Sequence, residues 1–277
     1  MSALRFNDLV GFLREVFVRF PDGRRGKNLS YTMLDAALSA FAVFFTQSPS
    51  FLAHQQAMQK ARGKSNAQSL FEIQQTPCDN QIRDLLDPVS PQTLYPVFDQ
   101  VYEALRAQGI IQSFRGVLDS TLIALDGTWY HSSQNIHGPC CCHQEHKDGQ
   151  ITYYHSALTP VIVAPGFASA EPGRAVDNHR FAQAEPGRPE VISLRPEFIT
   201  PQDGHTKQDC EIAAAKRWLE QNTARYLHGP VTLLGDDLYA HQPFCRRTLL
   251  QGFHFLFVCK PDSHPTLYQW VKLLQPG

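Results

Sequence analysis

Two apolar segments of the sequence run directly into carboxylates, the side chains best suited to bind a hard metal ion. Residues 231–234 (VTLL) lead through Gly235 to the adjacent Asp236 and Asp237, and "LIALDGT" places Asp126 in a similar setting. Carboxylates that meet at the ends of neighbouring strands repel one another unless a cation neutralises them, and Mg²⁺ usually takes one or two carboxylates. Two such ions, about 4 Å apart, can hold both oxygens of a phosphoryl transfer. The pattern predicts a divalent-cation site, with a plain Asp-Gly turn at 126 as the alternative.

A second set of metal-binding residue types lies in the segment "HGPCCCHQEHKDG". Its candidate zinc ligands are Cys140, Cys142, His143 and His146, because thiolate and imidazole are zinc ligands and four of them close a structural site. Three consecutive cysteines cannot all turn toward one ion, and the spacing differs from that of zinc fingers. The alternative is a loop that carries reduced thiols.

The composition is that of a globular chain that can bury a sizeable core. Of 277 residues, 43% are hydrophobic and 18% charged, enough for one large domain or two modest ones. The net charge of -1 gives no global positive field toward a polyanion. The longest apolar stretch, residues 36–45, is shorter than the ~20 residues of a membrane span. Seven cysteines, an odd number, favour a reducing cytoplasm, so we expect a cytoplasmic protein without membrane contact.

The first 112 residues have a helical pattern. An apolar stripe recurs at helical spacing at Leu9, Leu13, Val16 and Phe20. Further helices are expected from Ser30 to Phe45, from Asp79 to before Pro88, and from Pro91 to Gly109.

From residue 113 onward the pattern becomes that of a mixed α/β sheet. Strand-forming residues dominate "VLDSTLIALDGTWYHSS", "ITYYHSALTPVIVAPG" and "VISLRPEFIT". A helix with Trp218 on its apolar face follows, and Thr206 and Asp209 give it a capping pattern. A strand, a short helix and the strand "FHFLFVCK" come next. Residues 166–190, rich in Pro and Gly, are expected to form an exposed loop insertion.

Four successive blocks, "LIALDGTWYHSSQNI", "TYYHSALTPVIVAPG", "PEFITPQDGHTKQDCEIAAAKRW" and "GDDLYAHQPFC", resemble DDE-type insertion-sequence transposases. The resemblance runs from about residue 118 to residue 260. It implies an α/β fold with an incomplete RNase H-like mixed sheet, preceded by an all-helical N-terminal region. It further implies a DNA-end-binding region over residues 1–112 and a catalytic domain over residues 113–277 that lacks its C-terminal part.

The resemblance also assigns the acids. In the family the first acid ends the first strand in an Asp-x-Thr setting, which Asp126 fits best, with Asp119 as its rival. The second acid precedes an aromatic residue by three positions, as Asp236 precedes Tyr239. Asp126 and Asp236 are thus the expected catalytic residues and ligands of Mg²⁺ or Mn²⁺. Asp237 adds negative potential, or is itself the ligand if the register differs. The implied reaction is metal-dependent DNA strand cleavage and strand transfer.

The third acid of the family, a Glu beyond the second Asp, has no counterpart in the sequence. The last Glu is Glu220, and the only acid after Asp237 is Asp262. The chain therefore resembles a C-terminally truncated transposase, which we expect to be inactive in strand transfer. One alternative is a non-catalytic DNA-binding remnant or dominant-negative regulator that pairs with an intact transposase. The other is a zinc-binding protein built on the loop from Cys140 to His146.

Small groups of basic residues are candidate DNA contacts in the helical part. They are Arg24, Arg25 and Lys27 in "DGRRGK", and Arg83 on the short helix after Asp79. Residues 1–100 carry 10 Lys and Arg against 9 Asp and Glu, a net charge of +1, which is weak for binding driven by phosphate neutralisation. The expected partner is double-stranded DNA, as transposon ends and target, at the bacterial nucleoid.

Overall fold

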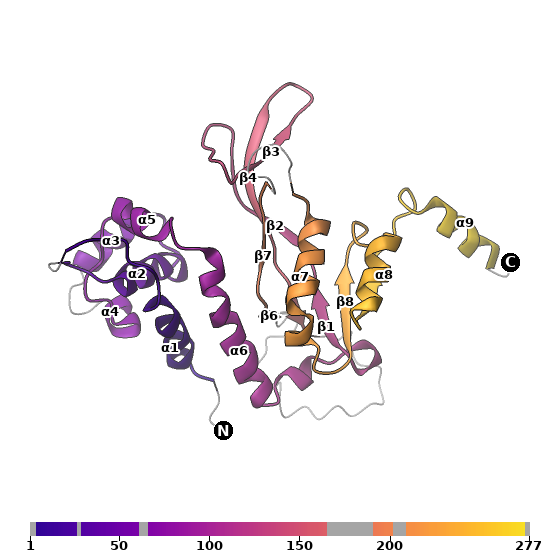
Figure 1. Ribbon diagram of the computed structural model, residues 1–277, viewed down its shortest axis with the longest axis horizontal. Helices are drawn as coiled ribbons and strands as arrows, with labels where there is room; N and C mark the ends of the chain where they lie inside the picture. The colour runs from indigo at the N-terminus through magenta and orange to yellow at the C-terminus, as the bar shows by residue number, and fades with distance from the viewer. Residues whose placement is uncertain (1–3, 27–28, 61–65, 165–190, 202–208, 275–277) are drawn as a thin grey trace. The chain divides into compact units, whose positions relative to one another are not determined.

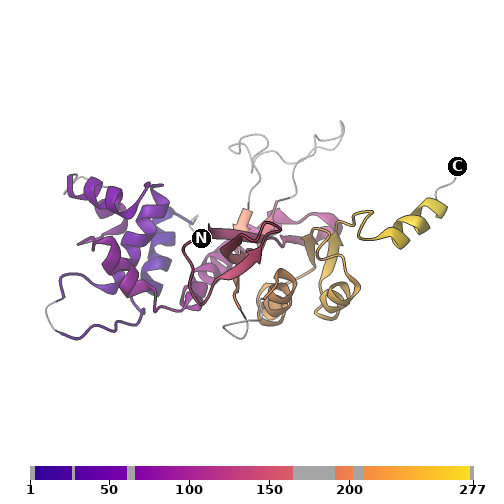
Figure 2. The same ribbon diagram turned by 90° about the horizontal axis from the view of Figure 1, so that it is seen from above.

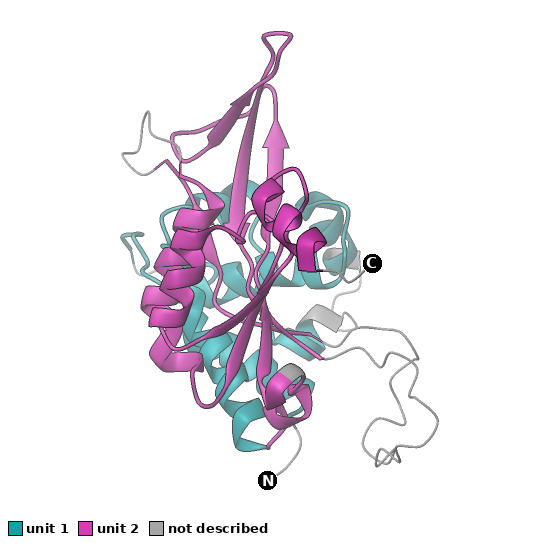
Figure 3. Cartoon of the chain, turned by 90° about the vertical axis from the view of Figure 1, so that its right-hand side faces the viewer, with its two compact units in different colours: residues 1–108 teal, residues 109–277 magenta. Residues whose placement is uncertain are grey.

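The computed structural model of the chain describes residues 4–26, 29–60, 66–164, 191–201 and 209–274. It divides into two compact units, residues 1–108 and residues 109–277 (Figure 3). The sequence predicts the change near residue 112, and the chain passes from one unit to the other at Gly109. This glycine takes a φ of 75° directly after a helix, a left-handed conformation that glycine adopts without strain.

The first unit is helical, as the sequence predicts. Its helices are α1 (Phe6–Phe17), α2 (Met33–Phe45), α3 (Phe51–Lys60), α4 (Asn66–Phe71), α5 (Asp79–Leu86) and α6 (Tyr95–Ala107), with a 3-10 turn at Pro91–Leu94. The second helix begins after Thr32 rather than Ser30, because the Thr32 hydroxyl accepts a 3.0 Å hydrogen bond from the Asp35 amide and Asp35 accepts one in return. Pro96 lies in the first turn of α6, where no amide donor is needed.

Aromatic side chains fill the core of this unit. Phe71 is fully buried, and its ring lies 5.5–6.0 Å from those of Phe6, Phe41 and Phe45. Helix α2 is apolar around most of its circumference, as expected of a helix that neighbours cover on several sides.

The second unit contains strands and helices in alternation. Its elements are 3-10 turns at Ile111–Phe114 and Val117–Asp119, β1 (Thr121–Ala124), β2 (Gly127–Ser133), β3 (Cys142–Glu145), β4 (Ile151–Leu158), β5 (Val161–Val163), β6 (Val191–Ser193), β7 (Glu197–Ile199), α7 (Glu211–Tyr226), β8 (Val231–Gly235), α8 (Gln242–Leu250), β9 (His254–Phe257) and α9 (Pro265–Leu274). The predicted mixed α/β class is therefore observed. The predicted insertion at 166–190 lies outside the described residues.

The strands form two sheets (Figure 1). The larger has the order β6-β5-β1-β8-β9, in which β1 pairs parallel with β8 and β8 parallel with β9, while β5 pairs antiparallel with β1 and β6. The smaller, here called the hairpin sheet, consists of β2, β4 and β3, with β7 also paired to β4. Figure 2 shows α7 and α8 on the same side of the larger sheet.

Helix α7 is anchored by its apolar face. Trp218 is fully buried, and its indole N–H donates a 2.8 Å hydrogen bond to the carbonyl of Arg195. The helix begins at Glu211, so Asp209 precedes it, and Thr206 of the predicted capping pattern lies outside the described residues.

Helix α9 at the other end of the unit has no buried residue. Among the described residues, no helix is both long enough and apolar enough to cross a membrane.

Candidate divalent-cation site at the strand ends

The parallel pair β1 and β8 brings the two predicted catalytic aspartates to one edge of the sheet. Ala124 is the register partner of Leu234, and the amide of Leu125 donates a 2.9 Å hydrogen bond to the Leu234 carbonyl. Asp126 and Asp236 each follow two residues after that pair, where the strands end. Both side chains are exposed.

A buried tyrosine, Tyr239, follows Asp236 by three positions. Tyr239 is 1% exposed, and its ring packs 5.4 Å from that of Phe244. Burial strongly raises the pKa of the Tyr239 phenol, and the negative charges of Glu211, Asp236 and Asp126 raise it further. The Tyr239 hydroxyl donates its hydrogen bond to Glu211.

Gly235 explains how such a large ring fits at a strand end. A Cβ at this position would lie 2.7 Å from Cδ2 of Tyr239 and 3.1 Å from the Phe257 ring. Only glycine leaves room for the aromatic side chain, so the sequence Gly-Asp-Asp combines a space requirement with an exposed acid.

A third carboxylate, which the sequence analysis did not single out, reaches the same edge from α7. Glu211 accepts a hydrogen bond from the Tyr239 hydroxyl, and a Cβ on Gly127 would overlap its other oxygen. Helix α7 leads into β8 and runs back along the sheet, so its first turn lies where β1 and β8 end (Figure 1). An acid in the first turn of such a helix is the signal that could have identified Glu211. We call Asp126, Asp236 and Glu211 together the acidic edge.

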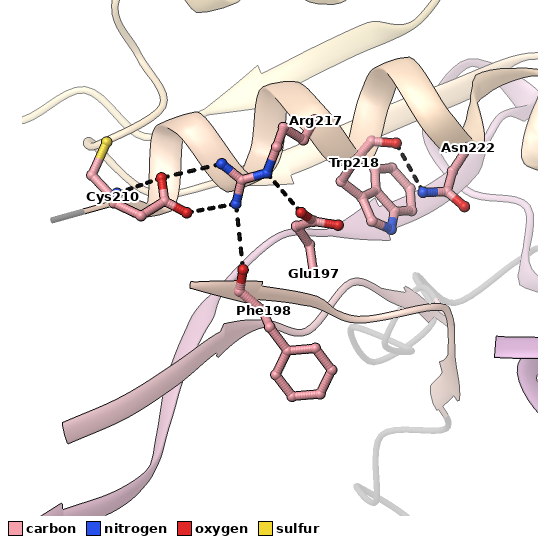
Figure 4. Close-up of polar contacts among 7 residues, drawn as sticks. Glu197, Phe198, Cys210, Arg217, Trp218 and Asn222 are labelled. Carbon is pink, nitrogen blue, oxygen red and sulfur yellow. Dashed lines mark hydrogen bonds and ion pairs between the residues drawn. The ribbon is translucent and has the colours of Figure 1, made fainter. Parts of the chain in front are cut away.

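Arginine-centred ion pairs hold the first turn of α7 in place (Figure 4). The Arg217 guanidinium donates to Glu197 at 2.7 Å, to Asp209 at 2.5 Å and to the Phe198 carbonyl at 3.3 Å. Asp209 also accepts the Cys210 amide at 2.9 Å. The hydrogen bond to Asp209 is the main reason that the pKa of Arg217 is raised. The ion pairs of Arg217 thus connect Glu197 of β7 to Asp209, which lies two residues before Glu211.

The carboxylate of Asp237, the third predicted metal ligand, contacts other residues of the protein. It is 9% exposed, accepts the Lys260 amide at 2.6 Å and lies 3.3 Å from His264. A hydrogen bond from Ser263 is the main reason that the pKa of Asp237 is lowered, and the Lys260 amide adds to it. Of the two adjacent acids, Asp236 is exposed, whereas Asp237 is engaged within the fold.

Asp119, the rival of Asp126, lies at the opposite end of β1. It pairs with Arg115 at 2.8 Å and has a φ of 51°. Because the strand from Thr121 to Ala124 separates the two aspartates, Asp126 is the one on the edge shared with Asp236.

The predicted zinc ligands take separate environments on the hairpin sheet. Cys142 is fully buried with its thiol 3.8 Å from the Ile199 carbonyl, whereas Cys140 and His143 are exposed. His146 hydrogen-bonds Thr152 at 2.8 Å. Burial raises the pKa of the Cys142 thiol. These four residues do not fit a closed zinc site.

A different cysteine on the hairpin sheet has a histidine partner. The Cys141 sulfur lies 2.9 Å from Nε2 of His155, a pair that the sequence analysis did not select. Over the described residues as a whole, no three His, Cys, Asp or Glu side chains are grouped as metal ligands. The acidic edge presents two exposed aspartates, Asp126 and Asp236.

The predicted DNA-binding arginines differ in how closely their charges are paired with nearby carboxylates. Arg24 makes two hydrogen bonds to Asp22, at 2.9 and 2.8 Å, and lies over the Tyr31 ring. Arg25 is exposed, and the Arg83 side chain is 61% exposed with Asp79 3.9 Å away. Lys27 lies outside the described residues. Among the three described arginines, Arg24 is the one whose charge is paired most closely within the fold.

Comparison of the chain with protein-family models, with curated proteins and with solved structures finds no match.

Proposed function

We propose that residues 109–277 form an RNase H-like catalytic domain of a DDE-type transposase, in which Asp126 and Asp236 hold Mg²⁺ or Mn²⁺ next to a DNA phosphate. The observation that carries the proposal is the parallel pairing of β1 and β8. It brings to one edge two exposed aspartates that lie 110 positions apart in the sequence. The four sequence blocks that resemble the transposase family support the same assignment.

The chemistry of the acidic edge suits a hard cation. Carboxylate oxygens are preferred by Mg²⁺ and Mn²⁺, and the exposed side chains of Asp126 and Asp236 leave room for water and phosphate oxygens. A bound ion would stabilise charge on the phosphate during in-line attack by water or a 3′-hydroxyl. Because the attacking group is not a protein side chain, the site needs no nucleophilic residue.

The helical unit is proposed to bind double-stranded DNA in the bacterial cytoplasm, at the nucleoid. Arg25 and Arg83 would contact the phosphate backbone, which fixes position without reading sequence.

A second candidate is a non-catalytic DNA-binding protein that regulates an intact transposase. The observation in its favour is that no Glu follows Asp236 within these 277 residues. Both candidates require DNA binding, and they differ in whether the chain cleaves DNA.

Binding of Mn²⁺ to the purified chain tests the first candidate, with titration calorimetry or the loss of the free-ion paramagnetic resonance signal as readout. Replacing a carboxylate ~4 Å from a divalent ion by a neutral side chain costs about 2 kcal/mol of binding free energy in bulk water. This cost corresponds to a loss of at least about tenfold in affinity. We expect that loss for Asp126→Asn and for Asp236→Asn. Asp119→Asn is the matched control and should bind as the unaltered chain does. Absence of Mn²⁺ binding, or equal loss in the control, refutes the site.

Incubation with DNA in the presence of Mn²⁺ separates the two candidates. Salt-sensitive DNA binding with cleavage that Asp126→Asn abolishes supports the catalytic assignment. Salt-sensitive binding without cleavage supports the regulator. DNA binding that is absent at low salt contradicts both.

A further inference from the structure

We propose that Glu211 is a positioning residue of the acidic edge, because its carboxylate joins the two segments that carry Asp126 and Asp236. The inference rests on the proposed function for its meaning, but its geometry is independent of any bound ion.

One carboxylate contacts both turns. Oε1 of Glu211 accepts the hydrogen bond from Tyr239, three residues after Asp236. Oε2 faces Gly127, which directly follows Asp126. The two strand ends are thus connected through a side chain of α7 in addition to the hydrogen bonds of the sheet.

A side chain at Gly127 would displace the Glu211 carboxylate. A Cβ on this residue would overlap Oε2 of Glu211 and lie 2.6 Å from its Cδ. The backbone after Asp126 therefore lies directly against the carboxylate, and a shift of either group moves the other.

The donor on the other side is rigid. The Tyr239 ring is 1% exposed and packs against Phe244, Phe257 and Gly235, which restricts the movement of its hydroxyl. A tyrosine phenol has an ordinary pKa of about 10, so at neutral pH it is protonated and donates its hydrogen bond to Glu211.

The helix that carries Glu211 is itself fixed. The ion pairs of Arg217 with Glu197 and Asp209 tie the start of α7 to β7, and Trp218 anchors the next turn. Residues that orient metal-binding side chains without touching the ion typically change metal affinity by 10–100-fold when they are removed. Glu211 has the placement that such a role requires.

The test compares variants that separate placement from charge. Glu211→Ala removes the connection, Tyr239→Phe removes only its donor, and Glu211→Gln keeps an oxygen that accepts the Tyr239 hydrogen bond. Glu220→Gln removes the same charge from an exposed position on the same helix and is the matched control. We expect Mn²⁺ affinity to fall about tenfold in Glu211→Ala and Tyr239→Phe, and to be largely retained in Glu211→Gln and Glu220→Gln.

Hydrogen exchange of the Leu125 amide gives a readout that needs no metal, since this amide pairs with Leu234 at the base of the edge. We expect about tenfold faster local exchange in Glu211→Ala and Tyr239→Phe, with the rate largely restored in Glu211→Gln, while global unfolding stays cooperative.

Three outcomes overturn the inference: unchanged exchange in Glu211→Ala, no rescue of exchange by Glu211→Gln, or a loss of Mn²⁺ affinity in Glu211→Gln that equals the loss in Glu211→Ala. The last would mean that the charge itself binds the ion. If the unaltered chain binds no Mn²⁺, the proposed function fails, and the exchange rates still decide the role of Glu211.

Discussion

The acidic edge and the hairpin sheet both carry residue types that bind metals. The fold brings these residues to one place at the acidic edge but separates them on the hairpin sheet. At the edge, Asp126 and Asp236 come from distant parts of the sequence and leave the sheet side by side. On the hairpin sheet, Cys140, Cys142 and His143 are neighbours in sequence, and one is buried while the others are exposed.

The difference follows from strand geometry. Parallel strands in register end at the same edge, so residues just beyond them converge whatever their separation in sequence. Along one strand, successive side chains point to opposite faces, so consecutive ligands are pulled apart. Residues that are adjacent on one strand are therefore poor candidates for ligands of the same metal ion. Residues just beyond the ends of two paired parallel strands are better candidates.

The largest expected loss of stability comes from replacing a tryptophan, and we compare Trp218 of helix α7 with Trp129 of the hairpin sheet. Trp218→Ala empties a fully buried site behind the acidic edge and should lower the free energy of unfolding by about 3–5 kcal/mol. Trp129 is 50% exposed and stacks on Tyr154 in the hairpin sheet, so Trp129→Ala should cost about 1 kcal/mol. Urea unfolding measures both. Similar losses would mean that α7 does not support the edge as described.

Substituting one glycine in each of the two regions tests the same difference in packing. Gly235→Ala places a methyl group against the rings of Tyr239 and Phe257 and should destabilise the protein by about 1–3 kcal/mol. Gly138→Ala, near the cysteines, meets nothing within 4 Å and should be close to neutral. Thermal unfolding of the two variants checks this, and a neutral Gly235→Ala would show that the tyrosine packs differently.

Asp237 should affect acid stability rather than cation binding. Its pKa is lowered in the folded state, so its contribution to stability is complete above the unfolded value of about 3.9 and is lost as pH falls through the lower folded value. Asp237→Asn should therefore flatten the decline of stability below about pH 4. The melting temperature between pH 7 and pH 3 is the measurement. Mn²⁺ affinity lost as severely as in Asp236→Asn would reassign the ligand.

The smallest effect concerns thiol reactivity on the hairpin sheet and leaves stability unchanged. The thiolate is the reactive form, and burial raises the pKa of Cys142, so alkylation near pH 8 should be much slower at Cys142 than at exposed Cys140. Peptide mass spectrometry after brief iodoacetamide treatment resolves the two sites. Equal rates, or stoichiometric zinc that protects both thiols, would restore the zinc hypothesis.

Much of this architecture could be read from the sequence. Apolar runs that end in acid singled out Asp126, Asp236 and Asp237, and the family resemblance selected Asp126 and Asp236 among the candidate acids. The switch from helical to alternating patterns predicted a boundary near residue 112, close to the division between the two units. The acid in the first turn of α7 was visible in the sequence, but the role of Glu211 was not, because that role depends on where the first turn lies relative to β1. The same is true of Asp237, whose partners Lys260 and His264 lie in a later loop. Contacts between distant segments are fixed by packing, which short sequence windows do not encode.

The pairing of Thr121 with Val231 also determines when the acidic edge can form during folding. That contact closes a far longer loop than the pairing of Glu145 with Ile151 in the hairpin sheet, and the difference costs about 2–3 kcal/mol of chain entropy. Contacts of high sequence separation form slowly, so we expect the hairpin to be present before β1 and β8 meet. The two aspartates are then brought together only in the last stage of folding. A cation that requires both will bind the completed fold alone, and it will act as a folding-coupled stabiliser whose effect grows with its concentration.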